Sequence, residues 1–222
     1  MNEAARSRRV EPSPQLVETG VMAILRGTST ERFNDICHVL VDAGITCLEI
    51  TLSSLGAVDA ITSVRSELPS TVDVGAGTVT TADEVRKVLD AGAGFIVSPS
   101  VELDVMGAAV DAGVPVYPGA LTPTEIIRAW RAGASAVKLF PASAVGPSYL
   151  KDVSGPCPDI RLMPTGGIAL DCIGDWIRAG ALGVGLGGSL QGDAADGGDL
   201  AALAERAEKA VGQVRQARRD SE

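Results

Sequence analysis

The sequence predicts an α/β protein folded as a single-domain (β/α)8 (TIM) barrel. An Ala-Gly pair stands at five places where a helix is expected to end, and an apolar run typical of a strand follows each of them within a few residues. Successive glycines lie 48, 21, 20 and 47 positions apart, which is one or two periods of roughly 20 to 25 residues. Glycine at such a place ends a helix, because it takes the left-handed conformation without a steric penalty. The pairs are Ala43-Gly44, Ala91-Gly92, Ala112-Gly113, Ala132-Gly133 and Ala179-Gly180.

Eight candidate strands are set apart by these signals. They span residues 21–26, 46–52, 72–78, 94–99, 114–119, 135–140, 160–165 and 182–187. Strands that alternate with helices pair in parallel, and eight such units close into a barrel. An open doubly wound sheet shares the alternation and stays the alternative. A last helix, about 198–218, is expected to pack against the first units.

Two helix starts carry a capping-box pattern. They are Thr81-Ala82-Asp83-Glu84 and Thr122-Pro123-Thr124-Glu125, the second with proline at the first helical position. Residues 1–14 have neither an apolar period nor the apolar core of a secretory signal. We expect them to form a mobile N-terminal tail, with residues 15–222 as the barrel domain.

Composition excludes several classes of function. The formal net charge of −9 and a pI near 4.7 argue against nucleic acid or an anionic membrane as a partner. No apolar stretch approaches the roughly 20 residues of a membrane span. A cytoplasmic location follows as an expectation.

Metal and serine-nucleophile chemistry are also disfavoured. The four cysteines show no metal-ligand spacing and are expected to be reduced, and we expect neither a metal nor a cofactor. The single histidine, His38, lies beside a helical apolar stripe and is interpreted as a surface residue. One histidine so placed cannot supply a multi-histidine zinc site or a convincing Ser-His-Asp triad.

Lys138 is the most informative residue, because it lies within the apolar run 136–141. A charged amine in a buried strand is costly to desolvate, and burial favours the neutral, nucleophilic form that makes Schiff bases with ketones. Period-two alternation turns Lys138 inward on the sixth strand and Glu49 inward on the second. The alternative is a structural ion pair between these two residues.

Further candidates stand at the carboxyl ends of other predicted strands, where barrel active sites lie. Gly-Gly pairs follow strands seven and eight, where barrels often bind phosphate through backbone N–H groups; plain turn chemistry is the alternative. The candidates at these ends are Arg26, Thr78, Pro99, Phe140, Thr165, Gly166, Gly167, Gly187, Gly188 and Ser189.

At these residues the chain resembles the 2-keto-3-deoxy-6-phosphogluconate (KDPG) and 4-hydroxy-2-oxoglutarate (KHG) aldolases. The resemblance runs from about residue 17 to 212, in order and at matching spacing. It rests on Glu49-Ile50-Thr51-Leu52, residues 74–79, Ile96-Val97-Ser98-Pro99, residues 137–141 and Pro164-Thr165-Gly166-Gly167-Ile168.

That resemblance implies a metal-free class I aldolase, a usually trimeric (β/α)8 barrel. It implies Lys138 as the Schiff-base lysine and Glu49 as the general acid/base. It gives Thr78 and Pro99 to the pyruvate end and Phe140 to packing around the imine. The phosphate end would fall to Thr165, Gly166, Gly167, Gly188 and Ser189.

One departure from the family pattern concerns the substrate carboxylate. The best-known members carry an arginine where this chain has Ser53, and that arginine helps bind the carboxylate. Arg26, at the end of the first strand, is our candidate substitute, with its planar fork as the binding group. A solvent-facing arginine is the alternative.

The expected reaction is cleavage of KDPG to pyruvate and glyceraldehyde 3-phosphate, with KHG as a further substrate. The phosphogalactonate isomer is an alternative, because residues 140–147 also resemble that branch. A barrel that binds a sugar phosphate without turning it over is another. A homotrimer is expected from the resemblance alone.

Overall fold

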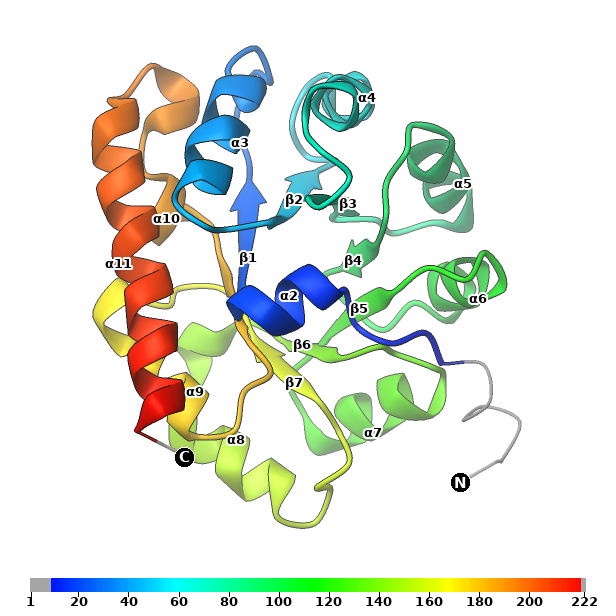
Figure 1. Ribbon diagram of the computed structural model, residues 1–222. Coiled ribbons are helices and arrows are strands. Elements are labelled where there is room, and N and C mark those ends of the chain that lie inside the picture. The colour runs from blue at the N-terminus through cyan, green and yellow to red at the C-terminus, as the bar shows by residue number, and fades with distance from the viewer. Residues whose placement is uncertain (1–8, 221–222) are drawn as a thin grey trace.

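The computed structural model describes residues 9–220 and shows eight strands ringed by helices (Figure 1). The strands are β1 (Val21–Leu25), β2 (Cys47–Thr51), β3 (Asp73–Gly77), β4 (Ile96–Ser98), β5 (Val116–Ala120), β6 (Val137–Leu139), β7 (Leu162–Pro164) and β8 (Val184–Leu186). Neighbours pair in parallel in the order β7-β6-β5-β4-β3-β2-β1-β8. A parallel bridge between Thr165 and Gly185 then brings β7 beside β8. The predicted barrel is confirmed, and the open sheet is wrong.

Helices follow the strands as the glycine period predicts. They are α2 (Pro14–Thr19), α3 (Phe33–Asp42), α4 (Ala57–Glu67), α5 (Ala82–Asp90), α6 (Leu103–Asp111), α7 (Pro123–Arg131), α8 (Pro147–Ser154), α9 (Ile173–Arg178), α10 (Gly188–Gln191) and α11 (Leu200–Arg219). All five helix-ending glycines have positive φ, between 72° and 103°. Both capping boxes form, at Thr81 and at Thr122. The last helix, α11, packs against α3 and α9.

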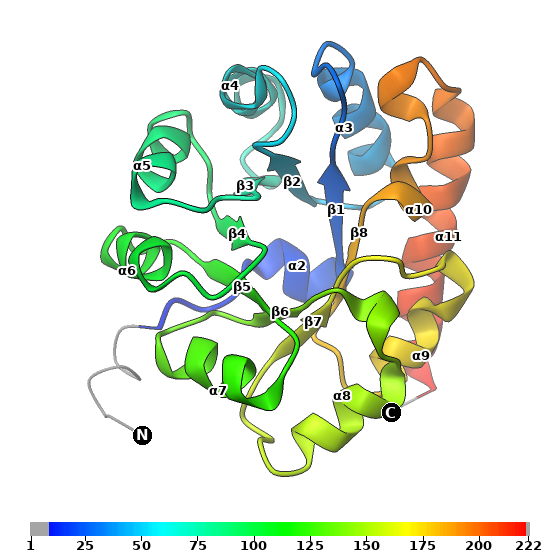
Figure 2. The ribbon, with the colours of Figure 1, turned by 180° about the vertical axis from the view of Figure 1, so that it is seen from behind.

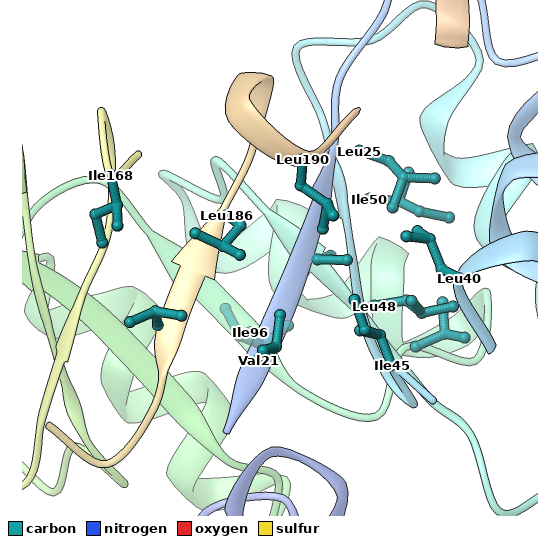
Figure 3. Packing of buried hydrophobic residues seen from close by; sticks show 14 of the residues in the cluster. Val21, Leu25, Leu40, Ile45, Leu48, Ile50, Ile96, Ile168, Leu186 and Leu190 are labelled. Atoms are coloured by element: carbon teal, nitrogen blue, oxygen red, sulfur yellow. The ribbon is translucent and has the colours of Figure 1, made fainter. Parts of the chain in front are cut away.

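Strand alternation divides the apolar side chains into two layers. Leu48, Ile50 and other outward residues fill the layer between strands and helices (Figure 3). Cys47 and Ala136 lie in a separate cluster inside the barrel. Because side chains along a strand point alternately to opposite faces, Glu49 and Lys138 point inward with Cys47 and Ala136.

The amino-terminal segment closes the bottom of the barrel. Helix α2 crosses the centre of the view in Figure 1 and lies behind the strands in Figure 2, and its Leu16 joins the interior cluster. Residues 1–8 of the expected mobile tail lie outside the described residues. The remainder differs from that expectation: Arg9 stacks 3.5 Å from the Trp130 ring centroid, and the Ser13 N–H donates to the Tyr117 hydroxyl at 2.8 Å. No local sequence pattern predicts these tertiary contacts.

Several smaller expectations can be compared with the structure. The side chain of His38 is exposed and lies 3.5 Å from a carboxylate oxygen of Glu67, which confirms a surface residue. Cys37 and Cys47 are buried, and burial raises the pKa of each thiol. Of the helices within residues 9–220, none is long and apolar enough to cross a membrane.

Candidate active site

A cavity of about 470 Å³ opens at the carboxyl ends of the strands. Eleven of the twelve predicted site residues line it, and they come from six different strand ends. They are Arg26, Thr78, Pro99, Lys138, Phe140, Thr165, Gly166, Gly167, Gly187, Gly188 and Ser189. The twelfth, Glu49, is outside this lining set and is 1 % exposed. The barrel therefore brings together residues that are up to 163 positions apart, from Arg26 to Ser189.

Lys138 lies on β6, paired with Gly119 of β5 and Met163 of β7. Its residue is 7 % exposed, and its amine lies 4.9 Å from the centroid of the Phe140 ring. The cavity thus reaches an amine that is otherwise surrounded by protein. Among the described residues no ion pair joins Lys138 to Glu49, so the simple structural ion pair is absent from this structure.

Glu49 is a buried carboxyl group with unused hydrogen-bonding capacity. Burial raises its pKa, while the positive charges of Lys138 and Arg26 act in the opposite direction. Its Oε2 atom has no hydrogen-bond partner among the described residues. On β3, Gly77 makes room for this carboxyl group, because a Cβ there would overlap Glu49 Oε1. An unsatisfied buried carboxyl oxygen is costly, and such groups concentrate at functional sites.

The loops after β7 and β8 form another wall of the cavity. Gly166 and Gly167 follow β7 with φ values of 91° and 73°, which favour glycine. A Cβ on Gly167 would come within 2.6 Å of the Ser143 Cβ, so the close approach of the loop after β7 to the segment after β6 also requires glycine. The loops bring backbone to the cavity surface in the way that anion-binding barrels use.

Arg26 and Ser53 lie at a second hollow, which adjoins the cavity. This hollow measures about 500 Å³ and is shared with Thr78 and Asp196. The arginine that follows β1 therefore lines the same hollow as Ser53, the position at which the family pattern places an arginine. Thr78 has a left-handed φ of 59°, a conformation that is strained for a threonine and is found mainly where a site requires it.

Sequence reasoning missed several residues that line the cavity. They are Ile24, Ile168, Gly185, Gln191, Gly192 and Asp196. Ile24 and Gly185 lie on predicted strands, and the alternation of side chains along those strands could have shown that both face the barrel interior. Gln191 and Asp196 lie beyond β8, in a four-residue α-helix and a three-residue 3₁₀ helix that are too short for a periodic signal. No three His, Cys, Asp or Glu side chains in residues 9–220 gather in a group that could hold a metal ion.

Polar side chains and glycine-containing loops gather at the carboxyl ends of the strands. In (β/α)8 barrel enzymes the active site lies at this end. The family model for KDPG and KHG aldolases matches residues 13–205, so the chain belongs to that aldolase family. It is 35% identical over 190 residues to a probable 2-dehydro-3-deoxy-6-phosphogalactonate aldolase of Rhizobium meliloti, covering 85% of this chain and 89% of the relative.

Two solved structures extend the comparison. A native KDPGal structure superposes with a TM-score of 0.85 at 33% identity, covering 90% of this chain and 96% of that chain. A KDPG aldolase from Legionella pneumophila, in which pyruvate is captured as a covalent carbinolamine, superposes with a TM-score of 0.79 at 26% identity. That match covers 88% of this chain and 97% of the other.

Proposed function

We propose that this enzyme is a Schiff-base aldolase that cleaves KDPG to pyruvate and glyceraldehyde 3-phosphate. The observation that carries the proposal is the Lys138 amine, which meets the cavity from an otherwise buried position and shares the barrel interior with Glu49. The carbinolamine in the Legionella pneumophila relative is the covalent adduct that precedes such an imine.

The reaction begins at Lys138. Its nitrogen attacks the C2 ketone, and the carbinolamine loses water to give a protonated imine. Glu49, through a water, takes the proton of the C4 hydroxyl group as the C3–C4 bond breaks. The electron pair of that bond moves onto the imine to form an enamine, and glyceraldehyde 3-phosphate leaves. Glu49 then returns a proton to the enamine carbon, and hydrolysis of the imine releases pyruvate.

Glu49 is suited to both steps because burial and nearby cations affect it in opposite directions. Burial raises its pKa, which favours the protonated acid that the second step needs. Lys138 and Arg26 lower the pKa, which favours the carboxylate that the first step needs. Opposed effects of this kind keep a carboxyl group able to exchange protons during turnover.

The other lining residues take roles at the two ends of the substrate. Arg26 binds the carboxylate with its guanidinium fork, and Thr78 and Pro99 shape the pyruvate end. Phe140 packs against the imine. The phosphate is held at the opposite end by Thr165, Gly166, Gly167, Gly187, Gly188 and Ser189.

Borohydride trapping tests the proposal. With pyruvate present, borohydride should reduce the imine and leave a stable adduct on Lys138, one of four lysines in the chain. Lys138→Met should abolish the adduct and the cleavage, whereas Lys151→Met, at an exposed position on α8, should leave both intact. An absent adduct in the unmodified enzyme would replace the proposal with a sugar-phosphate-binding barrel that does no chemistry.

The phosphogalactonate isomer is the second candidate substrate, and the Rhizobium meliloti relative favours it by its name. The two substrates differ at one hydroxyl group, so kcat/KM for each, measured side by side with that for KHG, decides between them. A homotrimer and a cytoplasmic location stay predictions; light scattering of the purified protein checks the first.

A further inference from the structure

Arg26 is the first residue after β1, so it lies just beyond the hydrogen-bonded pairing of β1 with β2 and β8. The register of β1 with β8 ends at Ala23 and Leu186, and its register with β2 ends at Leu25 and Ile50. The backbone N–H and C=O of Arg26 therefore need partners from outside the sheet. Without them, the end of the strand would be free to move at the mouth of the cavity.

Gln191, on α10, supplies both partners. Its Oε1 accepts the Arg26 N–H at 2.9 Å, and its Nε2 donates to the Arg26 carbonyl at 2.6 Å. The side-chain amide thus takes the place of a neighbouring strand for Arg26. It can do so because an amide group carries both a hydrogen-bond donor and an acceptor. Because Gln191 is only 9 % exposed, this amide would be costly to bury without such bonds.

The position of Gln191 is itself fixed. Arg206, on α11, donates to the Leu190 carbonyl at 2.7 Å and to the Gln191 carbonyl at 2.9 Å. On the other side of Arg26, the N–H of Gly27 donates to Ser54 Oγ at 3.1 Å. The backbone that carries the Arg26 side chain is thus held by hydrogen bonds to Gln191 at Arg26 itself and to Ser54 at the next residue, Gly27.

We propose that Gln191 is a positioning residue that sets the direction of the Arg26 guanidinium for the substrate carboxylate. This inference rests on the proposed function, in which Arg26 binds that carboxylate. A guanidinium fork binds a carboxylate well only in a narrow geometry, so a displaced backbone weakens the contact without removing it. No family pattern or periodic signal in the sequence draws attention to this glutamine.

A double-mutant cycle on pyruvate tests the inference. The probe is the pyruvate concentration that gives half-maximal borohydride adduct, since pyruvate carries the carboxylate and lacks the phosphate. Gln191→Met keeps the length and apolar volume and removes both hydrogen bonds, so it should raise that concentration about tenfold. In an Arg26→Ala background, the same change should have no further effect, because Gln191 acts through Arg26.

A buried hydrogen bond far from the site provides the control. Ser135 Oγ accepts the Val116 N–H at 3.1 Å at the opposite end of the strands, so Ser135→Ala should lower Tm while leaving pyruvate binding unchanged. If Gln191→Met does not fold, Gln191→Asn carries the cycle, because it retracts the amide from Arg26.

Three results would overturn the inference in distinguishable ways. An equal effect of Gln191→Met with and without the arginine would show that the glutamine acts elsewhere. Unchanged pyruvate binding in Gln191→Met would remove its role, even if Arg26→Ala weakens binding. No pyruvate adduct in the unmodified enzyme would overturn the proposed function first, and this inference with it.

Discussion

The two ends of the barrel interior are built from the same strands, yet they treat buried polar groups differently. At the bottom, the Tyr117 hydroxyl accepts the Ser13 N–H at 2.8 Å, and Ser135 Oγ accepts the Val116 N–H. At the top, Glu49 Oε2 has no hydrogen-bond partner among the described residues. These two hydroxyl groups at the bottom find partners within the fold, and the Arg161 guanidinium there lies 2.7 Å from a carboxylate oxygen of Glu11. The carboxyl oxygen at the top has no such partner within residues 9–220.

Burial also has different chemical consequences for Tyr117 at the bottom and for Glu49 at the top. Burial raises the pKa of Tyr117, which only keeps the hydroxyl in its usual neutral form. Burial raises the pKa of Glu49 too, but a carboxyl group is ordinarily charged at neutral pH, so the folded state carries a cost. Changes at the top should therefore affect activity, with or without an effect on stability, whereas changes at the bottom should affect stability alone.

Glu49→Gln should give the largest effect. The amide cannot exchange the proton, so kcat should fall by about 10² to 10⁴-fold. The exposed Glu205→Gln on α11 is the matched control and should keep full activity. Equal turnover in the two variants would remove Glu49 from the mechanism.

The same substitution should raise stability at neutral pH. Because folding raises the pKa of Glu49, the unfolded chain releases its proton first as the pH rises from the ordinary value of 4.5. The unfolding free energy of the unmodified protein therefore falls between that pH and the higher pKa of the folded state. Gln cannot ionise, so urea unfolding should show its advantage growing across this window and vanishing at lower pH.

Leu16→Ala tests the opposite end. The side chain is fully buried in the interior cluster, so its truncation should lower the unfolding free energy by about 3 kcal/mol, with kcat unchanged once the protein is folded. Val17→Ala is the neighbouring control, because Val17 is 45% exposed and should cost far less. Loss of kcat in folded Leu16→Ala would contradict the separation of the two ends.

Gly77→Ala should disturb the top without removing any functional group. The new methyl group would overlap Glu49 Oε1 and displace the carboxyl group, so we expect kcat to fall about tenfold or more. Gly107→Ala is the control, since no heavy atom lies within 4 Å of its Cβ position and helical alanine is favoured. Similar activities would mean that the position of the Glu49 carboxyl group is unimportant.

Much of the site at the top of the barrel could be predicted from sequence, because the barrel topology places the carboxyl ends of all strands at the same end. Alternation predicts which way Glu49 and Lys138 point, and the five helix-ending glycines mark where five of the eight strands begin. The described strands lie within the expected ranges, except that β5 runs to Ala120, one residue further. Each of these features is local, so the sequence carries it.

The parts that sequence could not predict depend on contacts between distant segments. Gln191 meets Arg26 across 165 positions, and Arg9 meets Ala134 across 125. Neither lies in a periodic pattern, because one belongs to a four-residue helix and the other to an irregular segment. The predicted N-terminal tail, residues 1–14, therefore includes residues 9–14. In the structure this segment makes tertiary contacts at the bottom of the barrel.

Thr122→Ala should give the smallest effect, at a surface site that belongs to neither end of the interior. The Thr122 hydroxyl accepts the Glu125 N–H at 3.4 Å, and loss of this cap should cost about 1 kcal/mol of unfolding free energy with kcat unchanged. Thr124→Ala, two residues on and exposed, should cost much less.

The other half of this cap has its own pH dependence. Glu125 accepts the N–H groups of Thr122 and Leu121, which lower its pKa, so its contribution is present above the ordinary value of 4.5 and lost as the pH falls through the lowered pKa. Urea unfolding of Glu125→Gln should therefore show a stability deficit at pH 7 that shrinks in acid. A deficit that is constant with pH would mean that the carboxylate charge has no part in the cap.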